Sequence, residues 1–264
     1  MIRVGIGGWV YEPWRGVFYP KGLRQAEELA YASRKVTSIE INGTFYGTQK
    51  PESFRCWADE TPDDFIFSLK GPRYATHRRV LAEAGESIER FLASGVLELE
   101  SKLGPLVWQF APTKKFDADD FAAFLALLPP RLDGRSIRHA AEVRHESFLA
   151  PAFIDLLRKH SVAPVLVDSD KHPMIADVTS GFMYLRLERS SETIETGYKP
   201  AELDRWANRA KTWAEGGAPD ELPTIAPAVS GSSKRDVFVY TISGAKVRAP
   251  AAAMALIERL GRTG

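Results

Sequence analysis

Carboxylate side chains stand near the ends of several short, β-like runs of this sequence. Glu40, Glu142 and Asp168 each lie at or close to the last residues of such a run. Two carboxyl groups can act as acid and base when their surroundings separate their pKa values, as in barrel glycosidases. We therefore predict Glu142 and Glu40 as catalytic residues and Asp168 as a substrate-binding residue. Each carboxylate could instead orient a neighbouring cation.

Cationic side chains occupy similar positions in other runs, at Lys70, Arg144 and Arg186. Guanidinium groups bind carboxylate or phosphate through two parallel hydrogen bonds, and a desolvated lysine can act as a base or an amine nucleophile. The pattern indicates a small anionic substrate, such as a sugar phosphate or a sugar acid. We predict Lys70 as a third catalytic residue, either base or electrostatic stabiliser, and the two arginines as an anion clamp.

Polar and aromatic side chains follow the same runs. Aromatic rings around a polar site can stack on a sugar or a base, or can simply cap the end of a barrel. The further substrate-binding candidates are Trp9, Asn42, Tyr46, His77 and Gln109. The basic segment Arg73–Arg79 could hold phosphate or a nucleic-acid backbone, and the alternative for it is a solvated helix start.

Metal binding is the alternative use of some of these residues. Glu142, His145 and Asp168 could together hold a single Mg²⁺ or Mn²⁺ ion. The sequence has no H-E-x-x-H motif and no tight histidine cluster, and His139 and His172 are expected to lie away from this set. We therefore predict no metal and no cofactor, with that one divalent cation as the alternative.

The candidate residues belong to a chain in which β-like runs alternate with helical patterns. The runs have about four to eight residues rich in β-branched or aromatic side chains. The predicted strands are Ile2–Gly8, Ser38–Asn42, Phe65–Lys70, Leu106–Phe110, Ala140–His145, Pro164–Asp168, Phe182–Leu187 and Val237–Ile242. The predicted helices are Gln25–Arg34, Glu52–Asp59, Ser87–Leu99, Ala118–Leu128, Ala152–His160, Ala201–Ala214 and Ala251–Leu260.

Eight strands that alternate with helices predict a TIM-type (β/α)₈ barrel, which takes about 250 residues. We assign residues 1–264 to one such domain. An open doubly wound sheet is disfavoured because the first strand lacks the third glycine of G-x-G-x-x-G and the chain has no P-loop motif. The barrel should be irregular around its sixth helix, in Ser169–Gly181, and before its eighth strand, in the long loop Gly216–Ser233.

Polar and apolar residues alternate along these strands. Alternate residues of a strand share a face, so the apolar set must face the helices and the polar set the barrel axis. The polar set is Glu40, Asn42, Lys70, Gln109, Glu142, Arg144, Asp168 and Arg186. These side chains should meet at the C-terminal mouth, where barrel enzymes place their chemistry. Buried charges must pair or bind ligand, so a purely structural ion-pair network is the alternative.

Several stretches together resemble the DUF72 family, whose uncharacterised members include the YecE-like proteins. The matching stretches are Gly5–Trp9, Trp14–Pro20, Glu40–Tyr46, Phe65–Lys70, Thr76–His77, Gly104–Phe110, Glu142–His145, Ser147–Phe148 and Tyr184–Leu187. The resemblance covers roughly residues 2–213 and implies a TIM-type barrel, while the family's activity is not established. Two positions depart from it. Glu188-Arg189 stands where the family usually has His-Gly, and Tyr240–Gly244 replaces an Asn-rich turn.

The overall charge is close to neutral, with 35 Lys and Arg against 34 Asp and Glu in 264 residues. That balance disfavours a general nucleic-acid or membrane-surface binder. The single cysteine, Cys56, cannot form an internal disulfide. No targeting signal and no apolar stretch of about 20 residues is present, so we predict a cytoplasmic protein without a membrane partner.

These observations predict an enzyme that acts on a small polar anion at the barrel mouth. A hydrolase is the first expectation, followed by a lyase or an isomerase. The second interpretation is a metal-dependent phosphodiesterase or nuclease-like barrel that binds a nucleic-acid backbone through Arg73–Arg79. Nucleic acid is therefore an alternative partner, and the small anion is favoured over it. The third is a non-catalytic ligand-binding barrel. The sequence leaves the oligomeric state open.

Overall fold

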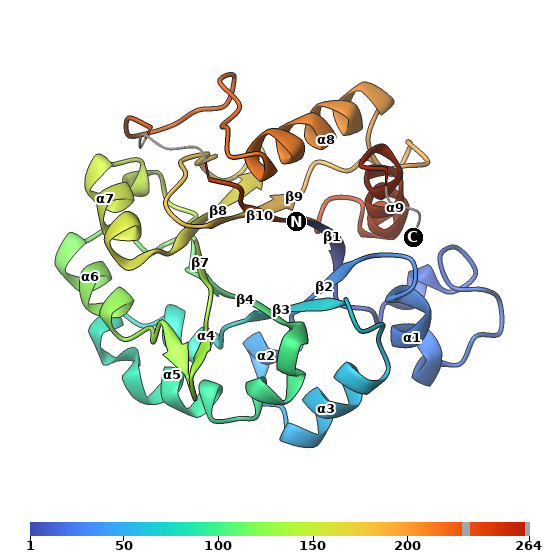
Figure 1. The fold of residues 1–264 in the computed structure, drawn as a ribbon, viewed down its shortest axis with the longest axis horizontal. Helices are drawn as coiled ribbons and strands as arrows, with labels where there is room; N and C mark the ends of the chain where they lie inside the picture. Colours follow the sequence, from blue (N-terminus) through green and yellow to red (C-terminus); the bar gives the residue numbers. More distant parts are fainter. Residues whose placement is uncertain (229–232, 262–264) are drawn as a thin grey trace.

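Eight parallel strands close into a barrel in the computed structural model of the chain, which describes residues 1–228 and 233–261. Around the barrel the strands follow the order β1-β10-β9-β8-β7-β4-β3-β2 (Figure 1). Their bounds are β1 (Ile2–Gly7), β2 (Ser38–Ile41), β3 (Ile66–Lys70), β4 (Leu103–Gln109), β7 (His139–Glu142), β8 (Ala163–Asp168), β9 (Phe182–Leu187) and β10 (Asp236–Thr241). The predicted TIM-type (β/α)₈ barrel is confirmed.

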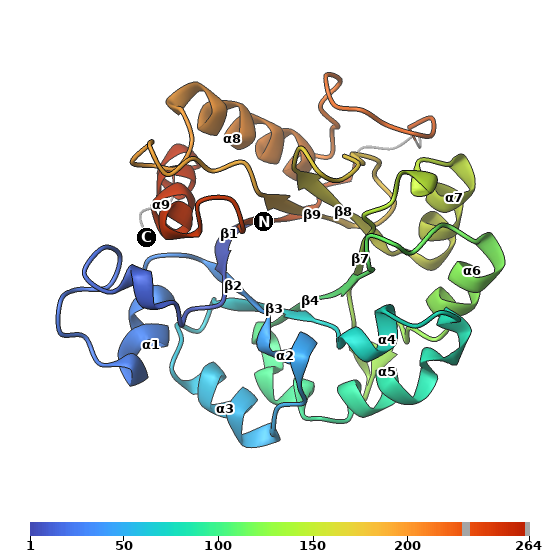
Figure 2. The same cartoon turned by 180° about the vertical axis from the view of Figure 1, so that it is seen from behind.

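Helices surround this barrel, as the view from behind also shows (Figure 2). The longer ones are α1 (Glu28–Ala32), α3 (Pro51–Asp59), α5 (Gly85–Leu92), α6 (Ala118–Ala126), α7 (Pro151–His160), α8 (Pro200–Ala214) and α9 (Ala249–Arg259). Two single-turn helices, α2 (Gly43–Tyr46) and α4 (Arg73–Thr76), follow strands β2 and β3. They were not predicted, because a four-residue helix is too short to show a helical period.

The two expected irregularities are present. Residues 169–181 contain no helix between β8 and β9, and residues 217–228 contain neither helix nor strand. The rest of the predicted loop before β10 includes residues 229–232, which lie outside the described residues.

Two predicted helices are shorter than expected. The pattern Gln25–Arg34 forms a 3₁₀ turn, Gln25–Glu27, followed by α1. The pattern Ser87–Leu99 breaks after α5, because Gly95 has φ of +105° and a 3₁₀ segment, Val96–Lys102, follows it. A Cβ atom at Gly95 would lie 2.6 Å from the Pro51 Cα atom, so this turn requires glycine. A small hairpin, β5 (Arg131–Leu132) with β6 (Arg135–Ser136), was also not predicted.

Side chains fill the interior of the barrel in layers. Phe182 and Phe238 belong to the inner apolar cluster, and Tyr184 and Tyr240 stack with ring centroids 5.0 Å apart. The Ser38 hydroxyl lies 2.7 Å from the Tyr240 hydroxyl, which satisfies both groups inside the barrel. The interior is therefore packed below its mouth, as in other barrels of this size.

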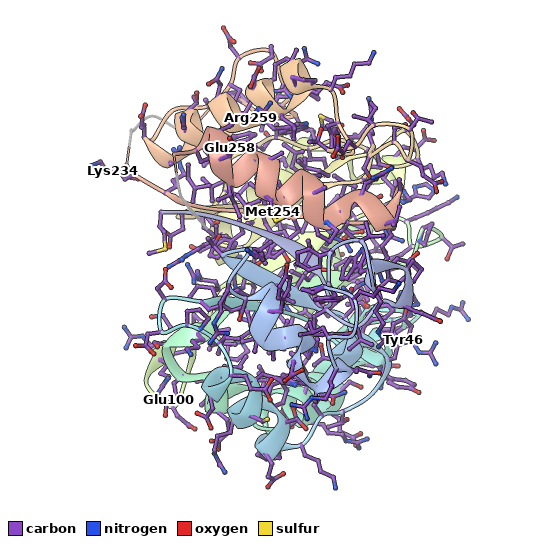
Figure 3. The ribbon with its side chains drawn as sticks, turned by 90° about the vertical axis from the view of Figure 1, so that its right-hand side faces the viewer. Tyr46, Glu100, Lys234, Met254, Glu258 and Arg259 are labelled. Atoms are coloured by element: carbon purple, nitrogen blue, oxygen red, sulfur yellow. The ribbon has the colours of Figure 1, made fainter. Side chains whose placement is uncertain are left out.

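The two ends of the barrel carry different segments of the chain. Tyr46, which follows β2, lies at one end, whereas Glu100 and Lys234, which precede β4 and β10, lie at the other (Figure 3). The polar candidates follow the strands and so belong to the end of Tyr46. In the part of the chain that the structure describes, no helix combines the length and the apolar character needed to span a bilayer.

Candidate functional site

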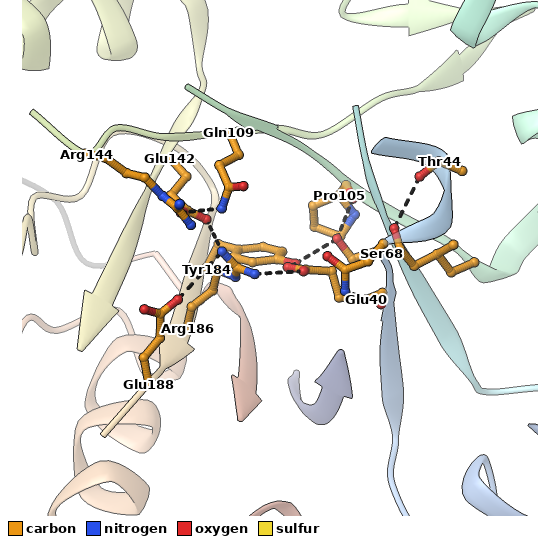
Figure 4. A network of polar contacts seen from close by, with 12 residues as sticks. Glu40, Thr44, Ser68, Pro105, Gln109, Glu142, Arg144, Tyr184, Arg186 and Glu188 are labelled. Atoms are coloured by element: carbon orange, nitrogen blue, oxygen red, sulfur yellow. Dashed lines mark hydrogen bonds and ion pairs between the residues drawn. The ribbon is translucent and has the colours of Figure 1, made fainter. Parts of the chain in front are cut away.

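Arg186 lies at the centre of a buried ion cluster at the C-terminal mouth (Figure 4). Its Nη2 atom lies 3.2 Å from Oε1 of Glu40, and its Nη1 atom binds Oε2 of Glu142. Both carboxylates are fully buried and the arginine side chain is 3% exposed. The three residues come from β2, β7 and β9, so the cluster ties together strands that are not neighbours in the sheet.

Neutral and charged groups complete the hydrogen bonding of the two carboxylates. Gln109 Nε2 donates to Glu142 Oε1 over 2.6 Å, and Arg144 Nε donates to the same oxygen over 2.7 Å. The Tyr184 hydroxyl donates to Glu40 Oε2 over 2.6 Å. Each carboxylate is thereby held in one orientation, as buried charges require.

The cluster keeps Glu142 ionised. Burial alone would raise the pKa of Glu142, but the guanidinium groups of Arg186 and Arg144, together with Lys70, lower this pKa to about 2. Burial disfavours the charged form of Arg186, yet Glu142 and Glu40 hold its pKa well above the ordinary value. Glu142 therefore carries no proton to donate near neutral pH.

Lys70 lies beside this cluster without joining it. Its side chain is 7% exposed, and its Nζ atom lies 4.3 Å from the centroid of the Phe45 ring. Within residues 1–228 and 233–261, no carboxylate lies within 4.0 Å of that nitrogen. The pKa of Lys70 is lowered to about 8, mainly by burial and next by the positive charge of Arg186. The negative charges of Glu40 and Glu142 oppose this shift.

A cavity of about 670 Å³ opens above these residues. The polar residues on its wall include Asn42, Lys70, Gln109, Arg144, Arg186 and Lys246. Glu40 and Glu142 do not line it, and both are fully buried. The volume is in the ordinary range for a small-molecule site.

The aromatic candidates occupy different parts of the rim. Trp9 lines the cavity and packs edge-on against Trp57, with ring centroids 5.3 Å apart. Tyr46 also lines it and is 65% exposed. His77 is exposed and packs against Phe45 with centroids 5.4 Å apart, but it does not line the cavity.

The predicted inward orientation of Asp168 is wrong. Val165 and Val167 belong to the inner cluster, whereas Leu166, which shares the face of Asp168, belongs to the outer core. Asp168 Oδ1 lies 3.2 Å from Nε of Arg189, outside the central cluster. Both faces of β8 are apolar, so its sequence shows no alternation from which the direction of Asp168 could be predicted.

The alternative metal ligands are not brought together. Glu142 is held by arginines, Asp168 contacts Arg189, and the His145 Nδ1 atom accepts a hydrogen bond from the Ser147 backbone amide over 3.1 Å. In the described ranges 1–228 and 233–261, no three His, Cys, Asp or Glu side chains form a group that could hold a metal ion.

The basic segment Arg73–Arg79 forms α4 and the turn after it. Arg78 is held by internal contacts, because its Nε atom donates to the Tyr74 carbonyl and its Nη2 atom to the Ser87 hydroxyl. The Arg73 guanidinium lies 5.5 Å from the Tyr74 ring centroid. Neither contact distinguishes a nucleic-acid site from a solvated helix.

Sequence reasoning missed one residue of the cluster. Glu188 Oε1 lies 3.8 Å from Nη1 of Arg186, and burial raises the pKa of Glu188. Its position two residues after Arg186 places it on the inward face, so the strand alternation could have identified it. Within the described residues, His172 Nδ1 has no hydrogen-bond partner, and burial lowers the pKa of this side chain.

A family profile described as "Protein of unknown function DUF72" matches residues 3–264. The chain belongs to the DUF72 family. The resemblance seen in the strand-end motifs is thus confirmed, and the match extends to the C-terminal residues that those motifs did not cover.

Two curated members of the family have similar sequences. The UPF0759 protein YecE of Escherichia coli (strain K12) is 29% identical over 153 residues, which are 57% of this chain and 51% of that protein. The UPF0759 protein YunF of Bacillus subtilis (strain 168) is 29% identical over 161 residues, 59% of this chain and 55% of that protein. The chain therefore spans about half the length of the curated relatives it matches.

Solved structures support the DUF72 fold. A DUF72 family protein from Thermotoga maritima has a TM-score of 0.78 at 23% identity, with 99% of this chain and all of that chain covered. A structure described as SacUVDE has a TM-score of 0.54 at 8% identity over the full length of both chains. At these identities the likeness concerns the fold alone.

Proposed function

We propose that this DUF72 barrel is an enzyme that acts on a small polar anion, such as a sugar phosphate or a sugar acid, with Lys70 as its base. The observation that carries this proposal is the position of the Lys70 amine. It reaches a cavity also lined by Arg144 and Arg186, and its pKa is lowered to about 8. A base whose pKa lies near the working pH is the most effective kind.

The two carboxylates suit a supporting role better than the acid and base roles expected from the sequence. Glu142 and Glu40 lie beneath the cavity wall, and both are engaged by Arg186. The low pKa of Glu142 leaves it without a proton to give. We assign them the task of fixing the arginine and setting the charge around Lys70.

This division of roles favours proton transfer at carbon over hydrolysis. Lys70 would remove a proton from the carbon next to a carbonyl or carboxylate group. The electron pair would then move to the oxygen, where Arg144 and Arg186 would stabilise the negative charge. An isomerase results if the proton returns to the former carbonyl carbon while the hydroxyl proton of the deprotonated carbon moves to the negatively charged oxygen. A lyase results if a leaving group departs with its bonding electrons from the carbon beyond the deprotonated one. Hydrolysis through two carboxyl groups needs one that holds a proton.

The test is a panel of sugar phosphates and sugar acids incubated with the protein in D₂O, read by mass spectrometry. We expect the wild-type protein to catalyse exchange of a carbon-bound hydrogen with solvent deuterium in at least one compound. Lys70→Met should abolish this exchange, and Lys21→Met, a change at an exposed lysine, should retain it. Release of a hydrolysed product without exchange would replace the proposal with the hydrolase first expected from the sequence.

Two other outcomes would also overturn it. If a compound binds tightly and is recovered unchanged and unlabelled, the barrel is a non-catalytic binder. If no sugar anion binds, but single-stranded or duplex DNA binds in a salt-sensitive way, the nucleic-acid interpretation replaces it.

A further inference from the structure

Lys246 is a second lysine on the wall of the cavity, which also carries Lys70, Arg144 and Arg186. It belongs to a 3₁₀ turn, Lys246–Arg248, directly after the loop that follows β10. Its Nζ atom lies 4.3 Å from the ring centroid of Tyr11 and 5.7 Å from that of Trp14. Across the described residues, no carboxylate lies within ion-pair distance of it.

The backbone of Lys246 is held firmly. The buried indole Nε1 of Trp14 donates to the Lys246 carbonyl over 2.8 Å, which joins the loop after β10 to the loop after β1. Ser243 and Gly244 both have positive φ, and a Cβ atom at Gly244 would lie 2.6 Å from the Glu188 carbonyl oxygen. The aromatic pair and the fixed backbone keep the ammonium group at the cavity instead of in bulk water.

Lys246 and Lys70 reach the cavity from different parts of the barrel wall. Lys70 ends β3, and two strands, β2 and β1, separate β3 from β10 around the barrel. Arg144 follows β7, which β8 and β9 separate from β10. The cavity is thus bounded by positive charge on both sides, with Trp9 and Asn42 also on its wall. In many barrels of this type the loop after the last strand holds a substrate phosphate.

We infer that the cavity binds a sugar derivative with an anionic group at each end, with a phosphate ester on Lys246 and a carboxylate on Lys70 and Arg144. This inference rests on the proposed function, because it uses the same cavity. It adds the orientation of the substrate. The phosphate group fixes the distal end, and the reactive carbon lies next to the Lys70 amine.

Three probes separate the two ends: gluconate with a carboxylate only, glucose 6-phosphate with a phosphate only, and 6-phosphogluconate with both. Binding is measured by calorimetry for wild-type protein and for Lys246→Ala, Arg144→Gln and Lys21→Ala. We expect Lys246→Ala to weaken both phosphorylated probes about tenfold or more and to leave gluconate within about twofold. Arg144→Gln should weaken gluconate and 6-phosphogluconate, and the exposed-site control Lys21→Ala should change nothing.

The outcomes distinguish the two proposals. If gluconate binds and Arg144→Gln weakens it, while Lys246→Ala leaves all three affinities unchanged, the phosphate subsite is wrong and the proposed function survives. If none of the three probes binds to wild-type protein, this inference is refuted, and the broader panel in D₂O decides the proposed function separately. Melting temperatures of all variants show whether a lost affinity reflects a lost fold.

Discussion

Replacing Lys70 with methionine should stabilise this protein at neutral pH. The buried amine has a pKa of about 8 in the folded chain, against an ordinary value of 10.5. The folded state therefore disfavours the charged form by about 3 kcal/mol relative to the unfolded state. Methionine has a similar length and no charge, so Lys70→Met removes that penalty. The expected rise in melting temperature is roughly 6–12 °C for a chain of this size.

The pH dependence tests the origin of this effect. Between pH 8 and 10.5 the unfolded chain binds more protons at Lys70 than the folded chain does. The free energy of unfolding of the wild-type protein therefore increases as pH rises through this range. Lys70→Met has no such gain. The stability difference between the two proteins should be full below pH 8 and should shrink by about 3 kcal/mol as pH approaches 10.5. A change in packing would add only a constant offset.

Urea unfolding from pH 7 to 10.5 measures the difference directly, because all other titrating groups are common to both proteins. Lys21→Met serves as the matched control, since Lys21 is exposed and should show no such trend. A stability difference between wild type and Lys70→Met that stays constant across this range would refute the lowered pKa, and with it the choice of Lys70 as base.

Three further outcomes are expected. Competitive amine labelling, read by mass spectrometry, should give Lys70 a titration midpoint near pH 8. Arg144→Gln should raise this midpoint and Glu142→Gln should lower it, because the first removes a positive charge and the second a negative one. Shifts of both variants in the same direction would contradict these assigned charge effects. Because the folded pKa of Glu142 is about 2 and the ordinary value is 4.5, its ion pairing stabilises the fold above pH 4.5, and this stabilisation is lost as pH falls toward 2. Glu142→Gln should lose roughly 3 kcal/mol at pH 7, and an unchanged unfolding curve would argue against a buried ion pair. Burial lowers the pKa of His139 to about 4, and its Nδ1 atom accepts a hydrogen bond from the Trp108 indole. The unfolded chain therefore binds more protons at this residue, and the free energy of unfolding should fall as pH decreases from 6.5 to 4. His139→Leu should remove this fall in acid titrations followed by circular dichroism.

The inward placement of most candidates was predictable because strand alternation is a local property. Glu40, Lys70, Gln109 and Arg186 reach the barrel interior or its mouth for that reason. Where the alternation is hidden, the prediction fails. Asp168 ends a strand that is apolar on both faces, and only the packed valines around it show which face is inside.

Contacts between distant segments were not predictable from local pattern. The residue that Arg186 pairs with depends on how the barrel closes and on the register between strands, so its bonds to both Glu40 and Glu142 arise from the tertiary structure. Lys246 lies in a short 3₁₀ turn whose position follows from the hydrogen bond between its carbonyl and Trp14. A turn of three residues has no periodicity that could place it.

The amino-acid sequence by itself determined the alternation of strands and helices, the barrel class, the family and the end of the barrel where polar side chains gather. These follow from residue order, because side-chain direction along a strand repeats every two residues. Only the tertiary structure decided which charges neutralise one another and which remain open to a cavity. Burial and distance set those energies, and they separate the ionised carboxylate of Glu142 from the amine of Lys70.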